Sequence, residues 1–247
     1  MKSTYTLQAS VIAIALFSAN AWAQQASAPS SKVGEMKSEV KVSGDVKQTA
    51  IGGKNNTQNL TLGGVEGSDV KKFLANVEVK GDVKQTITGG SENKQDLAVG
   101  SVQGSKIDTF EAKIKTGSLT QSIQGGSENS QTAKIGTVTG SEVKGKFTSV
   151  VDIKDVNQSA NGSNNSQNLA IGSIQGSKVG EGKSDIKVGG TINQNAIGKD
   201  NVQNLNLGSV QNSEVGKFNS KVTVTGDVGQ TAVGQGHKQS MNLGGVR

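Results

Sequence analysis

The chain has 247 residues, of which 32% are hydrophobic and 3% aromatic, and its formal net charge at pH 7 is +6. An average globular domain is about 45% apolar, so this composition does not predict an ordinary hydrophobic core. With 34 Gly, one Pro and no Cys, it also excludes a collagen helix, a disulfide scaffold and a thiolate metal site.

Residues 1–23 have the features of a secretory signal peptide. A basic residue precedes the apolar run Val11–Phe17, and Ala21-Trp22-Ala23 is a cleavage site of the small-x-small type. The apolar run is shorter than the ~20 residues of a transmembrane helix, so a membrane anchor is disfavoured. We therefore predict cleavage after Ala23, secretion to the extracellular space or a bacterial cell surface, and no transmembrane segment. Residues 24–35, rich in Ala and Ser, are predicted to be a flexible leader.

The remainder, residues 36–247, consists of six repeats of 36–37 residues. Two Gln positions recur in phase in every copy, which predicts a solenoid, propeller or array. The first Gln position is occupied by Gln48, Gln85, Gln121, Gln158, Gln194 and Gln230. The second is occupied by Gln58, Gln95, Gln131, Gln167, Gln203 and Gln239. The approximate repeats are 36–72, 73–109, 110–146, 147–182, 183–217 and 218–247.

Within each repeat, apolar and polar residues alternate with a period of two, which predicts β-strands. Val46-x-Gln48-x-Ala50 and Gln58-x-Leu60-x-Leu62 place each Gln on the apolar face of its strand, and a Gly/Asn corner separates them. A third strand follows in each repeat, then a fourth, shorter segment such as Val102–Ile107. The third strand carries an apolar column of Phe73, Phe110, Phe147 and Phe218.

These patterns predict an all-β, repetitive β-solenoid, with two arrangements open. A weaker half-repeat of about 18 residues favours two strand–turn–strand rungs per repeat, which gives twelve two-sided rungs over about 55 Å at the usual strand spacing. The alternative is six rungs with three or four sides each, about half as long.

The inward Gln side chains are the main candidate functional residues. Burying an amide without partners costs roughly 1–3 kcal/mol. In a stacked coil, however, the same side chain recurs one repeat along the axis, so each amide can donate to one neighbour and accept from the other. We predict Gln ladders that also fix the register, since a slip of one residue turns every Gln outward.

The two inward Gln residues and the Gly/Asn corner between them resemble the curlin repeats of bacterial curli. The Asn residues that match are Asn56, Asn93, Asn129, Asn165 and Asn201, and the sixth copy has His237 instead. The repeat is longer than the curlin repeat, as is the spacing from Gln to Asn. The resemblance implies a β-solenoid subunit that polymerises with itself into a surface amyloid fibre. It also implies a nucleator subunit and an outer-membrane secretion channel as partners.

No constellation of catalytic residues is found in the sequence. His237 is the only His, the acidic residues fall at corners or outward positions, and neither a calcium nonapeptide nor a P-loop is present. We therefore expect no enzyme activity, cofactor or metal. The pI of about 9.4 favours weak binding to anionic matrix polymers. Specific nucleic-acid binding is not expected, because no aromatic platform is available for base stacking.

Three functions remain open from the sequence. The leading prediction is a structural subunit of a surface amyloid-like fibre or biofilm matrix, which grows by rung-on-rung templating. The last copy ends after its second Gln strand, and this edge is either the docking edge or a frayed terminus. The alternative is a monomeric β-solenoid adhesin or surface-coat protein. An ice- or ligand-binding face built on the outward Thr49, Thr86 and Thr231 is disfavoured, because other residues interrupt that column.

Overall fold

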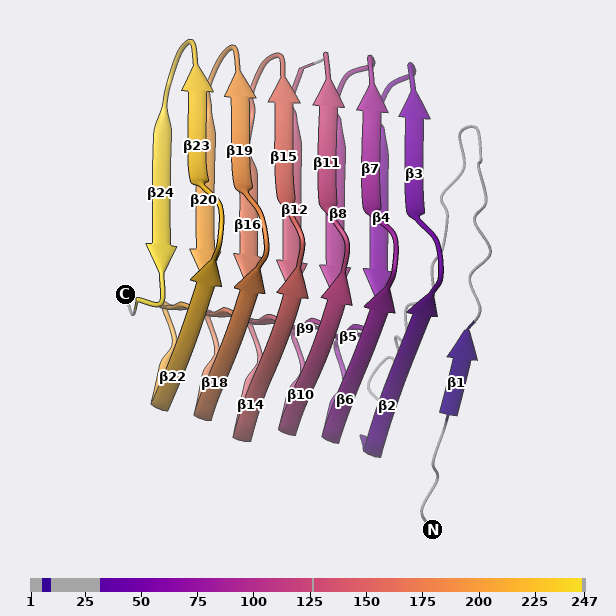
Figure 1. Ribbon diagram of the computed structural model, residues 1–247, viewed down its shortest axis with the longest axis vertical. Helices are drawn as coiled ribbons and strands as arrows, with labels where there is room; N and C mark the ends of the chain where they lie inside the picture. Colours follow the sequence, from indigo (N-terminus) through magenta and orange to yellow (C-terminus); the bar gives the residue numbers. More distant parts are fainter. Residues whose placement is uncertain (1–5, 10–31, 126, 246–247) are drawn as a thin grey trace.

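The protein is described by a computed structural model, which covers residues 6–9, 32–125 and 127–245. The chain winds into a β-solenoid of about 6 turns, here numbered coil 1 to coil 6 from the N-terminal end (Figure 1). Each complete coil contains four strands: a long strand, a first Gln strand, a second Gln strand and a short strand. The predicted β-solenoid class is therefore confirmed.

The strands of each kind recur in chain order. The long strands are β2 (Lys32–Val42), β6 (Asp69–Val79), β10 (Lys106–Thr116), β14 (Glu142–Ile153), β18 (Lys178–Val188) and β22 (Glu214–Val224). The first Gln strands are β3 (Val46–Ile51), β7 (Val83–Thr88), β11 (Leu119–Gln124), β15 (Val156–Asn161), β19 (Ile192–Ile197) and β23 (Val228–Val233). The second Gln strands are β4 (Thr57–Leu62), β8 (Lys94–Val99), β12 (Ser130–Ile135), β16 (Gln167–Ile171), β20 (Val202–Leu207) and β24 (Lys238–Leu243). The short strands are β5 (Val65–Glu66), β9 (Val102–Gln103), β13 (Val138–Thr139), β17 (Ile174–Gln175) and β21 (Val210–Gln211).

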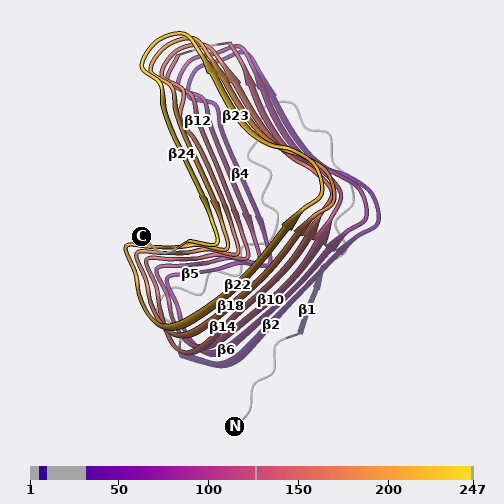
Figure 2. The same ribbon diagram turned by 60° about the vertical axis from the view of Figure 1, so that its left-hand side comes forward.

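Strands of the same kind stack along the axis into four parallel sheets. Residues at the same position of successive repeats pair with each other: Gln48 pairs with Gln85, and Phe73 pairs with Phe110. Viewed closer to the axis, the two Gln sheets form a narrow arm, and the long and short strands complete the coil beside it (Figure 2).

The preferred arrangement of twelve two-sided rungs is wrong, and the alternative of six rungs with several sides is correct. Each strand pairs with its equivalent one full repeat away, never half a repeat away, among the described residues. The physical reason is that the two halves of each repeat have strands of different lengths. One half of the repeat contains a long strand such as β6, of 11 residues, whereas the other half contains only short β-segments. Stacking the halves on one another would leave much of each long strand without a hydrogen-bonding neighbour.

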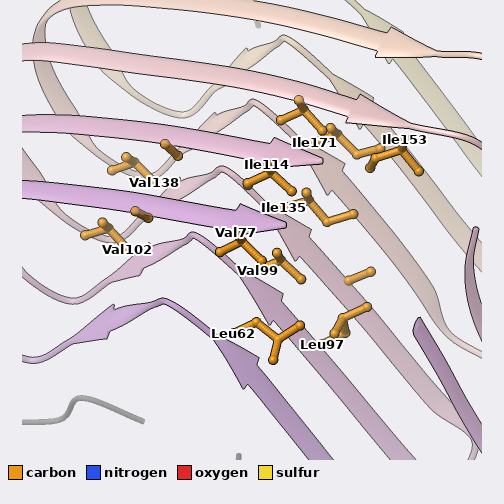
Figure 3. Close-up of a cluster of buried hydrophobic side chains, with 14 of the residues drawn as sticks. Leu62, Val77, Leu97, Val99, Val102, Ile114, Ile135, Val138, Ile153 and Ile171 are labelled. Carbon is orange, nitrogen blue, oxygen red and sulfur yellow. The ribbon is translucent and has the colours of Figure 1, made fainter. Parts of the chain in front are cut away.

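The hydrophobic core fills the junction where the long, second Gln and short strands meet. Figure 3 shows Val77 and Ile114 from the long strands beside Leu97, Ile135 and their equivalents from the second Gln strands. These side chains are nearly inaccessible to solvent. Because only the inward, alternate positions of the strands supply this core, a low overall apolar content is sufficient for it.

The Phe column lies against this core on the long strands. Phe73 and Phe110 stack with ring centroids 5.8 Å apart, and Phe110 and Phe147 stack at 5.3 Å. In coil 5 the register places Gly182 between Phe147 and Phe218. A Cβ on this glycine would meet the Phe218 ring at 2.5 Å, so the ring of coil 6 leans into the space that the missing side chain leaves.

The N-terminal segment contains one described strand, β1 (Thr6–Ala9), which pairs in parallel with Lys37–Val40 of β2. Most of the predicted signal peptide and its cleavage site at Ala23 lie outside the described residues. β2 begins at Lys32, so the strand includes the last residues of the segment predicted to be a leader.

Candidate assembly site

The first Gln position forms a continuous ladder through all coils. In each step the side-chain Nε2 of one coil donates to the Oε1 of the preceding coil, as Gln121 does to Gln85 at 2.8 Å. The other steps are Gln85 to Gln48, Gln158 to Gln121, Gln194 to Gln158 and Gln230 to Gln194, each at 2.7 Å. Because strand register already aligns these positions, the ladder requires no distortion of the backbone.

The second Gln position forms a parallel ladder with the same direction of donation. Gln131 donates to Gln95 at 3.0 Å, and Gln167 donates to Gln131 at 2.9 Å. The steps from Gln95 to Gln58, Gln203 to Gln167 and Gln239 to Gln203 measure 3.0, 3.0 and 3.1 Å. The predicted inward position of both Gln columns is thus observed throughout the six coils.

The ladder amides of coils 1 to 5 also join the two Gln sheets, as does Gln230 of coil 6. The second Nε2 hydrogen of Gln121 reaches the carbonyl oxygen of Thr132 at 3.0 Å, on the opposite sheet. In return, Gln131 reaches the carbonyl oxygen of Ser159, in the next coil, at 3.0 Å. Both amide hydrogens and the oxygen are therefore paired in the central coils, where Gln95 and Gln203 are 0% exposed. Full pairing explains why a buried polar column is tolerated in place of aliphatic residues.

The Asn column at the corner is less regular than predicted. Asn165 donates to Asn129 at 2.9 Å and Asn201 donates to Asn165 at 2.7 Å, whereas Asn56 donates in the opposite direction, to Asn93, at 3.0 Å. Asn93 in turn donates to the carbonyl oxygen of Gly125 at 3.2 Å. The ladder is therefore interrupted between coils 2 and 3. In coil 6 the exposed His237 occupies the position that Asn has in the other coils.

A third ladder, of serine, was not predicted from the sequence. The backbone N–H of Ser105 donates to Ser141 Oγ at 3.1 Å, and that hydroxyl donates to the carbonyl oxygen of Thr139 at 2.8 Å. The same pattern joins Ser68 to Ser105, Ser141 to Ser177 and Ser177 to Ser213. The recurrence of Ser in phase with Gln was the available signal. The hydrogen bonds of these serines could not be predicted without the geometry of the corner that follows each short strand.

Coil 6 is the last coil of the described stack, and no other described strand covers it. β22, β23 and β24 are each terminal in their sheets. Inward residues that are buried in the central coils are partly or fully exposed here, among them Met241 at 37% and Leu243 at 48%. Since donation runs from each coil to the preceding one, the Oε1 atoms of Gln230 and Gln239 have no donor among the described residues.

Several ion pairs form within coil 1. Lys41 Nζ lies 2.6 Å from Glu39 Oε1, and this contact lowers the pKa of Glu39 and raises the pKa of Lys41. The pKa of Asp45 is lowered first by a hydrogen bond from the backbone N–H of Asp82 in the next coil, and then by Lys47. The Asp45 carboxylate therefore joins coil 1 to coil 2, whereas the Glu39 carboxylate is paired within its own strand.

The described chain contains no group of three His, Cys, Asp or Glu side chains that could hold a metal ion. Within the same residues, no helix has the length and apolar character to cross a membrane. Comparison with protein-family models, with curated proteins and with solved structures found no match to this chain.

Proposed function

We propose that the protein is a secreted structural subunit that assembles with further copies of itself into an amyloid-like fibre or biofilm matrix. The observation that carries this proposal is the uncovered coil 6. It presents three unpaired strand edges, the acceptor ends of two Gln ladders, and apolar side chains such as Leu243. Unpaired edges of this kind template the addition of further strands.

The proposed mechanism is the addition of a new coil to an existing one. An incoming first coil would pair its backbone with β22, β23 and β24, and would extend both Gln ladders without a change of register. Growth of this kind requires no enzyme activity and no cofactor. A nucleator subunit and a secretion channel belong to the same proposal, by analogy with curlin subunits.

The direct test is assembly of the purified chain from Gln24 onward, which retains every coil. Thioflavin T fluorescence and electron microscopy, at tens of micromolar with and without preformed seeds, should reveal fibres that elongate faster with seeds. A chain that stays monomeric for days, even with seeds, would contradict the proposal. Gln230→Leu at the open end should slow elongation, whereas Gln124→Leu, on an exposed outward position, should not.

A monomeric adhesin or surface-coat protein is the second candidate. It is favoured by the outward face of the first Gln sheet, where small polar side chains such as Ser122, Ser159 and Asn195 lie in register. Such a face could bind a surface without polymerisation, and the net positive charge would add weak attraction to anionic polymers. A monomer that binds anionic polysaccharide but forms no fibres would support this candidate.

A further inference from the structure

The outer face of the long-strand sheet carries charges in rows that run along the solenoid axis. In two of these rows the sign of the charge alternates from coil to coil. By strand register, one row consists of Asp69, Lys106, Glu142, Lys178 and Glu214. The other consists of Lys41, Glu78, Lys115, Asp152 and Lys187.

The rows between these two carry charges in only some coils, and where two charges are neighbours in register their signs are opposite. Glu35 forms an ion pair with Lys72 at 3.3 Å, Glu181 pairs in register with Lys217, and Asp185 pairs with Lys221. Among the described residues of this sheet, every two charges that are paired in register have opposite signs. The first Gln sheet does not obey this rule, because it places Lys47 beside Lys84. The alternation is thus a property of the long-strand sheet alone.

This alternation makes the two ends of the solenoid complementary. The long strand of coil 6, β22, carries the exposed Lys217 and Lys221. The long strand of coil 1, β2, carries Glu35 and Glu39 at the equivalent positions. If coil 1 of a second copy stacks in parallel on coil 6, Lys217 meets Glu35 and Lys221 meets Glu39. Both contacts between the copies then join charges of opposite sign, as the neighbouring charges within one copy do.

Pairing of like ends gives the opposite result. Two copies that meet through coil 6 would have antiparallel long strands, which reverses the order of the rows. Lys217 of one copy would then face Lys221 of the other. Two copies that meet through coil 1 would place Glu35 opposite Glu39. Exposed ion pairs add little affinity, but contacts between like charges exclude wrong partners effectively.

We propose that the charge rows of the long-strand sheet select a second copy of this chain in one orientation, with its coil 1 parallel to and in register with coil 6. This inference rests on the proposed function and adds polarity and register to it. β1 pairs with part of the β2 edge, so coil 1 becomes fully available when the segment before Gln24 is removed.

The first test reverses the charges at each end separately. The tail variant is Lys217→Glu/Lys221→Glu, and the head variant is Glu35→Lys/Glu39→Lys, both in the chain from Gln24 onward. We expect fibre growth of each variant alone to be at least about tenfold slower than that of the unchanged chain at low salt. An equimolar mixture should grow at nearly the unchanged rate, because each reversed end finds its complement. The difference should fall in about 1 M salt, where charges are screened.

The matched control places the same reversal inside the solenoid. Lys113→Glu/Lys146→Glu reverses charges in the same two rows as the tail variant and alters the net charge by the same amount, but in interior coils. It should grow within about twofold of the unchanged chain and should not rescue the head variant. Tail and head variants that grow as fast as the unchanged chain would overturn the inference. Rescue of the head variant by the interior variant would do so as well.

A second test reads orientation directly and does not depend on fibres. The chain has no Cys, so Lys37→Cys and Asn219→Cys each introduce a single thiol, at equivalent positions of β2 and β22. Strands ~4.8 Å apart bring paired Cα atoms within reach of a disulfide. On mild oxidation of a mixture, we expect the mixed disulfide to dominate over either homodimer. Homodimers in excess, or no disulfide, would overturn the inference.

The two tests separate this inference from the proposed function. Mixed disulfides without fibres would contradict polymerisation and leave the polarity of pairing intact. Fibres that contain disulfides between like ends would support polymerisation and refute the polarity.

Discussion

Replacement of Gln121 by Leu tests whether the ladders stabilise the solenoid. Gln121 is 2% exposed and makes four hydrogen bonds that Leu cannot make, of which three are 3.0 Å or shorter. In these three it donates to Gln85 at 2.8 Å and to the carbonyl oxygen of Thr132 at 3.0 Å, and it accepts from Gln158 at 2.7 Å. The variant therefore leaves one amide oxygen, one backbone carbonyl and one amide hydrogen without these partners inside the arm.

The expected magnitude follows from these three groups. Each buried polar group that loses its partner costs about 1–3 kcal/mol, and burial of the Leu side chain recovers about 1–2 kcal/mol. The three groups together cost about 3–9 kcal/mol, so we expect a net loss of about 1–8 kcal/mol in the free energy of unfolding. For a chain of this size each kcal/mol corresponds to a decrease of about 2–4 °C in Tm.

The assay is urea unfolding of the monomeric chain from Gln24 onward, followed by far-UV circular dichroism. Gln124→Leu is the matched control, because it makes the same chemical change on the same strand at an exposed position. It should change the stability by no more than about 0.5 kcal/mol. Equal unfolding midpoints for the unchanged chain and Gln121→Leu would refute the view that the ladder stabilises the fold.

Three further predictions concern the ladders, the corners and the charges. The double variant Gln85→Leu/Gln121→Leu should cost less than the sum of the two single variants, because two adjacent ladder positions become apolar together; a double-mutant cycle in urea measures this coupling. Gly136→Ala should lower Tm more than Gly140→Ala: both glycines have positive φ, at 58° and 55°, but only at position 136 would the new Cβ collide with a side chain, that of Ser149. The folded-state pKa of Asp45 is lowered, so its contribution to stability should be present above about pH 4 and be lost as the pH falls through the folded-state value. The stabilities of Asp45→Asn and of the unchanged chain should therefore differ at pH 6, and the difference should shrink as the pH falls below about 4.

Much of the fold was accessible from the sequence because the repeat constrains it. Alternation around Gln48 and Gln58 identifies two strands and the inward direction of both amides, since a strand has a period of two. The Gly/Asn residues between them identify the corner, where Gly52 and Asn55 both adopt positive φ. Six copies in phase then predict stacking, and stacked amides predict ladders.

The number of rungs was decided only by the tertiary structure. Alternation of apolar and polar residues is a local property, and it is the same whether a strand stacks on its equivalent half a repeat or a full repeat away. Pairing of Phe73 with Phe110 and of Gln48 with Gln85 is a long-range choice. It is made because it pairs the long strands along nearly their whole length and brings amide onto amide.

The charge rows depend on the same choice. The sequence gives the sign of each charge, such as those of Glu35 and Lys72 or of Glu181 and Lys217. Only the register shows that these residues are neighbours and that their signs are opposite. The sequence by itself determined the β-structure, the repeat and the inward Gln. The pairing of distant strands determined the number of coils, the direction of the ladders and the complementary ends, because these depend on which backbone hydrogen bonds form between segments far apart in the chain.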